Sequence, residues 1–193
     1  MDRNGFRAFA ERLDVALRQQ DLEFFLDNVA FHGIRCKEPF APPASCKGLP
    51  GDAIVRGIEV GIWQSEGGAI DPEQYEKFIS EFLFNLAPGL SDEYGTASPR
   101  IYAFGVLREQ FRRLPQGVET VEAIIIRIAG PRPYDPIVPG PENQRQALSI
   151  GLTFDSARWT IAYLAVGQPD FFLDPQSPNL RQIFQSWQRW IIE

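Results

Sequence analysis

The chain opens with apolar residues at the spacing of an amphipathic helix. Four of them recur every three or four positions between charged residues: Phe6, Phe9, Leu13 and Leu17. This periodicity predicts a helix over residues 6–19. Asp21 carries a side chain suited to cap a helix, so a second short helix is expected in DLEFFLDN. Two helices should therefore begin the domain.

Apolar runs of strand length follow in six places. They are AFHGIRC, AIVRGI, RIYAFGVL, ETVEAIIIRIAG, RQALSIGLTF and WTIAYLAV. The last two are separated only by the turn DSAR, which predicts an antiparallel hairpin. PRPYDPIVPGPEN contains too many prolines for a central strand and is interpreted as a long surface loop.

Two further helices are predicted after the first strands. Asp71 can cap a helix that runs to Leu86, and Pro72 suits its first turn. The tail SPNLRQIFQSWQRWIIE has Ser177 as a cap, and its apolar stripe predicts an amphipathic C-terminal helix. We expect that helix to dock, as part of an extension over residues 168–193, on a domain formed by residues 1–167.

This order of elements resembles the NTF2-like, or SnoaL-like, superfamily. RQQDLEFFLDNVAF is similar to the family's opening, where a short acidic turn links the first two helices. The resemblance covers about Phe6 to Val166. It implies an α+β cone, in which a bent antiparallel sheet of about six strands wraps the long helix and leaves a cavity. The cysteine region and GIWQSEGG also resemble an uncharacterised group of exported bacterial domains, a resemblance that assigns no activity.

Composition and charge narrow the classes of function. The 193 residues are 44% hydrophobic and 23% charged, as in a globular protein, and the net charge of −6 argues against a nucleic-acid partner. No apolar run approaches the roughly 20 residues that span a bilayer, so no transmembrane segment is predicted. The start lacks the pattern of a signal peptide. No dinucleotide, phosphate-loop, zinc-protease or serine-hydrolase motif occurs, and no cofactor is predicted.

Cys36 and Cys46 are the only cysteines, and six Pro and Gly residues surround them. A disulfide between them would close a loop of about ten residues and stabilise the fold by roughly 2.5 to 3 kcal/mol, or less because the prolines already restrict the loop. Two free thiols, or a zinc site completed by His32, are the alternatives. The spacing matches no zinc motif, and no metal is predicted. A disulfide would favour an exported or envelope-associated protein, and free thiols a cytoplasmic one.

Candidate catalytic groups are few. An acid or base at the cavity wall is what the family's isomerases, cyclases and dehydratases imply, and Asp27, His32 and Glu122 are the candidates. Strand alternation places His32 with Ile34, a position more typical of a core or rim residue. Each carboxylate could equally be a surface charge.

Candidate ligand-binding residues are mainly aromatic. Trp63 and Glu66 lie between glycines that allow close backbone approach. Tyr102 and Tyr163 are strand aromatics whose polar tips could reach a cavity. Arg127 and Glu122 differ by an odd number of positions, so only one of them can face the cavity. Simple packing is the alternative for all of these aromatics.

Three functions remain open. The first is a domain that binds a small apolar molecule or a protein partner in or around the cone. The second is a small-molecule isomerase, cyclase or dehydratase with a cavity carboxylate, which rests on the fold resemblance. The third is an assembly module, for instance in a homodimer, in which an open sheet or the aromatic C-terminal helix pairs with another subunit.

Overall fold

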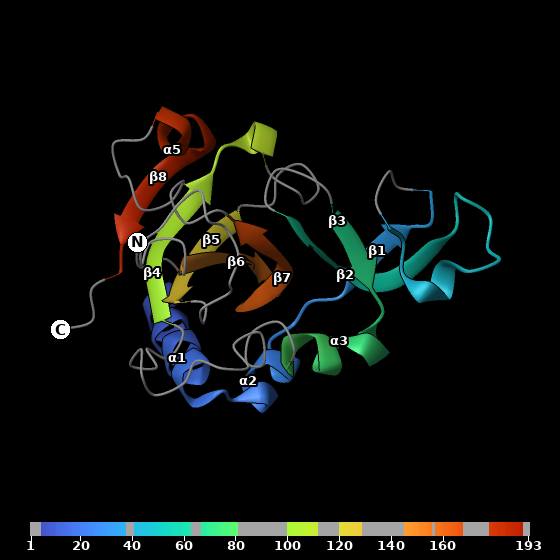
Figure 1. Ribbon diagram of the computed structural model, residues 1–193, viewed down its shortest axis with the longest axis horizontal. Coiled ribbons are helices and arrows are strands. Elements are labelled where there is room, and N and C mark those ends of the chain that lie inside the picture. The colour runs from blue at the N-terminus through green and yellow to red at the C-terminus, as the bar shows by residue number, and fades with distance from the viewer. Residues whose placement is uncertain are drawn as a thin grey trace, which may run out of the picture.

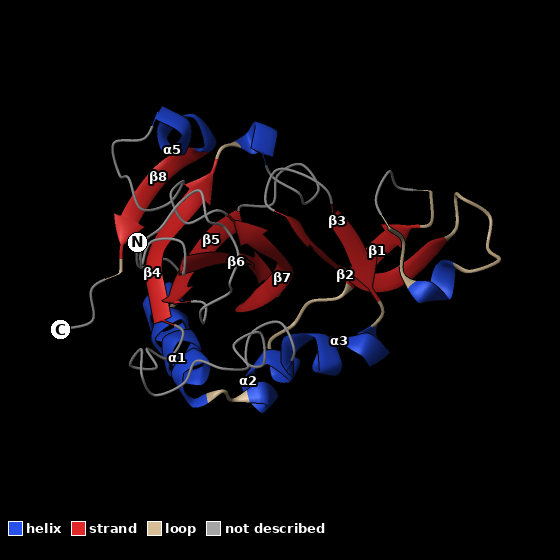
Figure 2. Cartoon of the chain, in the orientation of Figure 1, coloured by secondary structure: helices blue, strands red, loops and turns tan. Residues whose placement is uncertain are grey.

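One mixed sheet dominates the structure, with three helices along one side of it (Figure 1; Figure 2). The computed structural model describes residues 5–37, 41–62, 67–80, 100–111, 120–128, 145–155, 157–167 and 178–190. Within these residues the chain forms an α+β domain with an eight-stranded sheet.

The elements follow the chain in this order: α1 (Phe6–Gln19), α2 (Leu22–Asp27), β1 (His32–Arg35), the 3-10 turn η1 (Ala44–Cys46), β2 (Ile54–Ile62), β3 (Gly67–Ile70), α3 (Pro72–Ile79), β4 (Arg100–Leu107), the 3-10 turn η4 (Glu109–Phe111), β5 (Thr120–Ile128), β6 (Arg145–Asp155), β7 (Arg158–Gly167), α5 (Pro178–Ile183) and β8 (Phe184–Arg189). All six predicted strands and the two opening helices are present. Asp21 caps α2 as expected, because its carboxylate accepts a hydrogen bond of 3.1 Å from the Phe24 N–H.

The sequence suggested a wholly antiparallel sheet, but the observed sheet is mixed. Its strand order is β1-β2-β7-β6-β5-β4-β8, with β3 paired to β2. β6 and β7 form the predicted hairpin, whereas β2 and β7 pair in parallel, with Glu59 opposite Tyr163. β3 was missed because its sequence, GGAI, has low strand propensity. Its pairing with β2 compensates for this.

The core lies between the sheet and the three helices. The Phe6 ring of α1 makes edge contacts with Phe104 of β4 and Trp159 of β7, at centroid distances of 5.0 and 4.7 Å. Buried residues of α1, α3 and five strands surround these rings, among them Leu13, Leu17, Ile58, Ile79, Val121, Ile150, Ile161 and Leu164. The helix-facing side of the sheet is therefore apolar.

The opposite face of the sheet is buried as well, and it is more polar. Thr153 and Thr160 form a hydrogen bond of 3.2 Å between their hydroxyls on β6 and β7. Thr120, Ser149 and Tyr163 are also buried. Strands covered on both faces account for the nearly continuous apolar runs in the sequence.

The C-terminal tail differs from its prediction. The helix ends at Ile183, and the next six residues form β8, an edge strand paired with β4 (Figure 1). The predicted helix is thus wrong from Phe184 to Arg189, because pairing with β4 satisfies the backbone there and buries the Phe184 ring over Gly105. β8 belongs to the same sheet as the preceding strands, and the domain boundary at residue 168 stays a prediction.

The helix predicted from Asp71 to Leu86 is confirmed from Pro72 to Ile79. The remaining residues of its predicted apolar face, Phe82, Leu83 and Leu86, lie among residues 81–99, outside the described part of the chain. Among the described residues, no helix is long and apolar enough to span a bilayer.

Candidate functional site

Cys36 and Cys46 form a disulfide, as the first interpretation of the sequence predicted. Their Cα atoms are 5.4 Å apart, and the bond ties the end of β1 to η1. Both sulfur atoms are therefore bonded and cannot ligate zinc together with His32. No group of three or more His, Cys, Asp or Glu side chains in the described ranges is arranged to hold a metal ion.

The loop closed by this disulfide contacts β2 and β3. Ala41 forms two backbone hydrogen bonds with β3, through its N–H to Gly67 and through its carbonyl to the Ala69 N–H, at 3.3 and 2.9 Å. The buried Pro43 ring packs over Gly57 of β2, where a side chain would meet it. The loop is thus held on the β1–β2–β3 end of the sheet.

Asp71 does not use its carboxylate to cap α3, contrary to the sequence prediction. Its side chain instead accepts two hydrogen bonds from Ser45 in η1. The Ser45 N–H donates to Oδ2 at 3.0 Å, and the Ser45 hydroxyl donates to Oδ1. Asp71 is only 6% exposed, so these two donors take the place of the water that a free carboxylate would bind.

Tyr75 lies one turn after Asp71 and points into the core. Its ring makes an edge contact with Phe31, and the Arg56 guanidinium lies 5.4 Å from the Phe31 ring centroid. Tyr75 is 0% exposed, and its hydroxyl has no hydrogen-bond partner among the described residues. Burial raises the pKa of Tyr75 far above its ordinary value, so the phenol is neutral.

A second donor in the same core also lacks an acceptor. The indole Nε1 of Trp159 is buried without a hydrogen-bond partner in the described structure. Trp159 and Tyr75 both belong to the cluster between the sheet and the helices. Trp190, which packs against the same cluster, carries a third such donor in its Nε1. Because more than nine in ten buried polar groups are normally hydrogen-bonded, this group of donors is unusual.

His32 and Glu59 meet at the end of the sheet. His32 Nε2 lies 3.9 Å from Glu59 Oε1, a distance too long for a hydrogen bond, and both side chains are partly exposed. Glu59 also lies opposite Tyr163 in the β2–β7 register. The structure therefore brings His32 next to Glu59, whereas the Tyr163 ring lies over Gly151 of β6, the strand on the other side of β7. Sequence reasoning missed Glu59, because nothing in the strand pattern reveals a diagonal neighbour on another strand.

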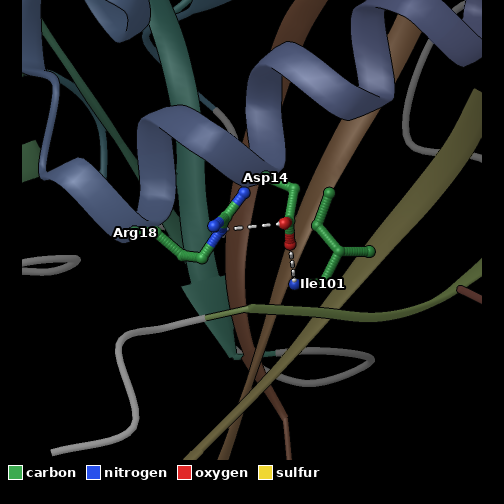
Figure 3. A network of polar contacts seen from close by, with 3 residues as sticks. All are labelled: Asp14, Arg18 and Ile101. Carbon is green, nitrogen blue, oxygen red and sulfur yellow. Dashed lines mark hydrogen bonds and ion pairs between the residues drawn. The ribbon is translucent and has the colours of Figure 1, made fainter. Parts of the chain in front are cut away.

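The carboxylate that is fully buried in the described structure is not one of those predicted. Asp27 is exposed at the end of α2, whereas Asp14 of α1 is 0% exposed. Its two oxygens accept hydrogen bonds from the Ile101 N–H at 3.0 Å and from Arg18 Nε at 3.1 Å (Figure 3). Asp14 lies on the apolar stripe of α1, three residues before Leu17. A carboxylate at such a position is the sequence signal that could have identified it as buried. Because both oxygens are engaged, Asp14 is a structural anchor.

Five other predicted site residues lie wholly or in part outside the described structure. Trp63 and Glu66 lie outside the described residues, as do the side chains of Tyr102, Glu122 and Arg127. The backbone register places Glu122 opposite Gly105 of β4 and Gly151 of β6.

Comparison with known proteins assigns no family. No protein-family model and no curated protein matches the chain. One solved structure, of a protein named Rd1NTF2_05 in a variant with five substitutions, is similar over 85% of this chain and 97% of its own, with a TM-score of 0.36 and 13% sequence identity. A likeness at this level determines neither a family nor a function.

Proposed function

We propose that this protein is an NTF2-like domain that binds a small apolar molecule between α3 and the sheet. The observation that carries the proposal is the Tyr75 hydroxyl, buried in an apolar core with no acceptor among the described residues. The family resemblance stated above, in which a sheet and a helix enclose a cavity, supports the same location.

The chemistry of the ligand follows from the Tyr75 hydroxyl and the ring beside it. An unsatisfied buried hydroxyl costs about 1 to 3 kcal/mol, and a bound molecule with an acceptor would recover this. The Phe31 ring, in edge contact with Tyr75, favours an apolar body. The proposed ligand is therefore a small apolar molecule that carries a carbonyl or ether oxygen.

The enzyme alternative rests on Glu122. Asp14 already accepts two hydrogen bonds and Asp27 is exposed, so neither fits the role of a cavity acid or base. The His32–Glu59 pair has no hydrogen bond that would orient the imidazole as a base. The assembly alternative relied on an open sheet or a helical aromatic tail, and β8 occupies most of the tail segment. Ligand binding is the function that the described geometry supports best.

The test compares two molecules of similar shape that differ in one acceptor. Acetophenone carries a carbonyl, and ethylbenzene is its matched hydrocarbon. Binding of each is measured by calorimetric titration and by thermal shift with wild type, Tyr75→Phe and Thr120→Val. Thr120 carries another buried hydroxyl without a partner among the described residues, on β5 at a position opposite Thr153 of the polar face, so it is the matched control.

We expect wild type and Thr120→Val to prefer acetophenone by about tenfold, the worth of one hydrogen bond, and Tyr75→Phe to lose that preference. Failure of wild type to bind either compound, or the same preference in Tyr75→Phe, contradicts the proposal.

A further inference from the structure

The disulfide and the first turn of α3 are joined by a short series of contacts. Cys36 directly follows β1, and Cys46 ends η1. Ser45, next to Cys46, gives both of its polar hydrogens to the Asp71 carboxylate at the start of α3. One covalent bond and two hydrogen bonds therefore connect β1 to the N-terminus of α3.

The Asp71 carboxylate has a second possible set of hydrogen-bond donors, the first N–H groups of α3. Its backbone, at φ −72° and ψ 157°, has the extended conformation of a helix N-cap residue. The first N–H groups of a helix lack acceptors within the helix, and an aspartate at this position normally supplies one. Here Ser45 occupies the carboxylate, and the Gln74 N–H bonds to the Asp71 carbonyl oxygen at 3.0 Å. A change of the Asp71 side-chain rotamer would release Ser45 and cap α3 instead.

We propose that the Cys36–Cys46 disulfide is a redox site that selects between these two arrangements. The reductant is a dithiol. One of its thiolates attacks Cys36, which is partly exposed, whereas Cys46 is 7% exposed. Cys46 leaves as a thiolate and takes a proton. The second thiol of the reductant then attacks the mixed disulfide and releases Cys36. Two electrons and two protons pass to the protein, and the dithiol becomes a disulfide.

Reduction of the disulfide changes, through chain entropy, whether the Asp71 carboxylate binds Ser45 or the N–H groups of α3. The closed loop of about ten residues keeps Ser45 close to Asp71, which raises its effective concentration there. Once the loop is open, Ser45 competes less well with the N–H groups of α3, which are always within reach of Asp71. The reduced protein therefore has a capped α3 and a released η1. This inference concerns the loop and the helix, and it holds whether or not a ligand binds at Tyr75.

The experiment is amide hydrogen exchange followed by NMR, on the intact chain with and without dithiothreitol. In the oxidised protein the Ser45 amide is protected by Asp71. After reduction we expect it to exchange at least tenfold faster, while the Glu73 and Gln74 amides exchange more slowly. The Ile150 and Leu164 amides, in the central strands β6 and β7, serve as the reference and stay protected. Cys36→Ser/Cys46→Ser should reproduce the reduced pattern without dithiothreitol.

Three variants separate the contributions of Asp71 and Ser45 from that of an unrelated hydroxyl. With Asp71→Ala, exchange at Glu73 and Gln74 should not depend on redox state, because neither arrangement can form. Ser45→Ala, which keeps the disulfide, should exchange faster at residue 45 in the oxidised protein. Ser186→Ala removes a hydroxyl from an exposed position of β8 and should change neither site. The proposal is overturned if Ser45 stays protected after reduction, or if Ile150 and Leu164 open together with it, since the disulfide would then act only as a staple.

Discussion

The Asp14 carboxylate and the backbone N–H of Ile101 form a hydrogen bond of 3.0 Å across 87 positions of sequence. This bond joins the middle of α1 to the start of β4 inside the core (Figure 3). It fixes where the first helix lies on the sheet.

Substitutions of Asp14 and Arg18 should lower the free energy of unfolding by different amounts, depending on which hydrogen bond is lost. Asp14→Ala leaves the buried Ile101 N–H without an acceptor, and we expect the free energy of unfolding to fall by about 1 to 3 kcal/mol. Asp14→Asn keeps an acceptor oxygen and should cost less. Arg18→Ala removes the donor to the other oxygen of Asp14, but this side chain is 42% exposed and water can replace it, so it should cost less than Asp14→Ala. Urea unfolding of the three variants measures this order, and equal losses for Asp14→Ala and Arg18→Ala would contradict it.

Tyr75 should make stability fall at high pH. Burial raises its pKa in the folded protein, whereas the unfolded chain ionises at about 10. Above that pH the unfolded state loses a proton that the native state retains, so this residue lowers the free energy of unfolding by up to about 1.4 kcal/mol per pH unit. Below it, the contribution is constant.

The Tyr75→Phe variant isolates this effect. The difference in unfolding free energy between Tyr75→Phe and wild type should be constant from pH 7 to 9 and should grow in favour of the variant above pH 10. Denaturant titrations across this range provide the measurement. Parallel curves for the two proteins would show that the phenol ionises equally in both states.

Gly151 should not tolerate a side chain. A Cβ atom there would lie 2.1 Å from the ring of the buried Tyr163 on the neighbouring strand. We expect Gly151→Ala to destabilise the protein by about 1 to 3 kcal/mol through overpacking. In a Tyr163→Leu background the added methyl has more room, so the same substitution should cost less. A double-mutant cycle measures the coupling, and additive effects would rule out this contact as the cause.

Loss of the disulfide should lower stability without unfolding the protein. The chain-entropy estimate is at most about 2.5 to 3 kcal/mol for this loop, while domains typically have 5 to 15 kcal/mol. Ala41 and Pro43, which precede η1, also hold their own part of the loop after reduction. Equilibrium unfolding of Cys36→Ser/Cys46→Ser gives the value. A variant without cooperative unfolding would contradict this expectation.

Local patterns predicted the elements that are stabilised mainly by their own residues. The apolar stripe of α1, the Asp21 cap and the DSAR turn each act within a few positions of sequence, and the structure confirms all three. The Cys36–Cys46 pairing was predictable because the chain offers no other pair. The runs that became β4 to β7 were predictable from length and composition.

The sequence by itself therefore determined the order of most elements and the disulfide. Only the tertiary structure decided which partner each polar group takes. Asp71 satisfies Ser45 instead of its own helix, Asp14 is buried because β4 presents an N–H to it, and Phe184 to Arg189 form a strand because β4 offers a free edge. In each case the deciding hydrogen bond joins residues far apart in sequence. Local periodicity reports only which side of an element is apolar, and it carries no information about the distant donor or acceptor that completes the site.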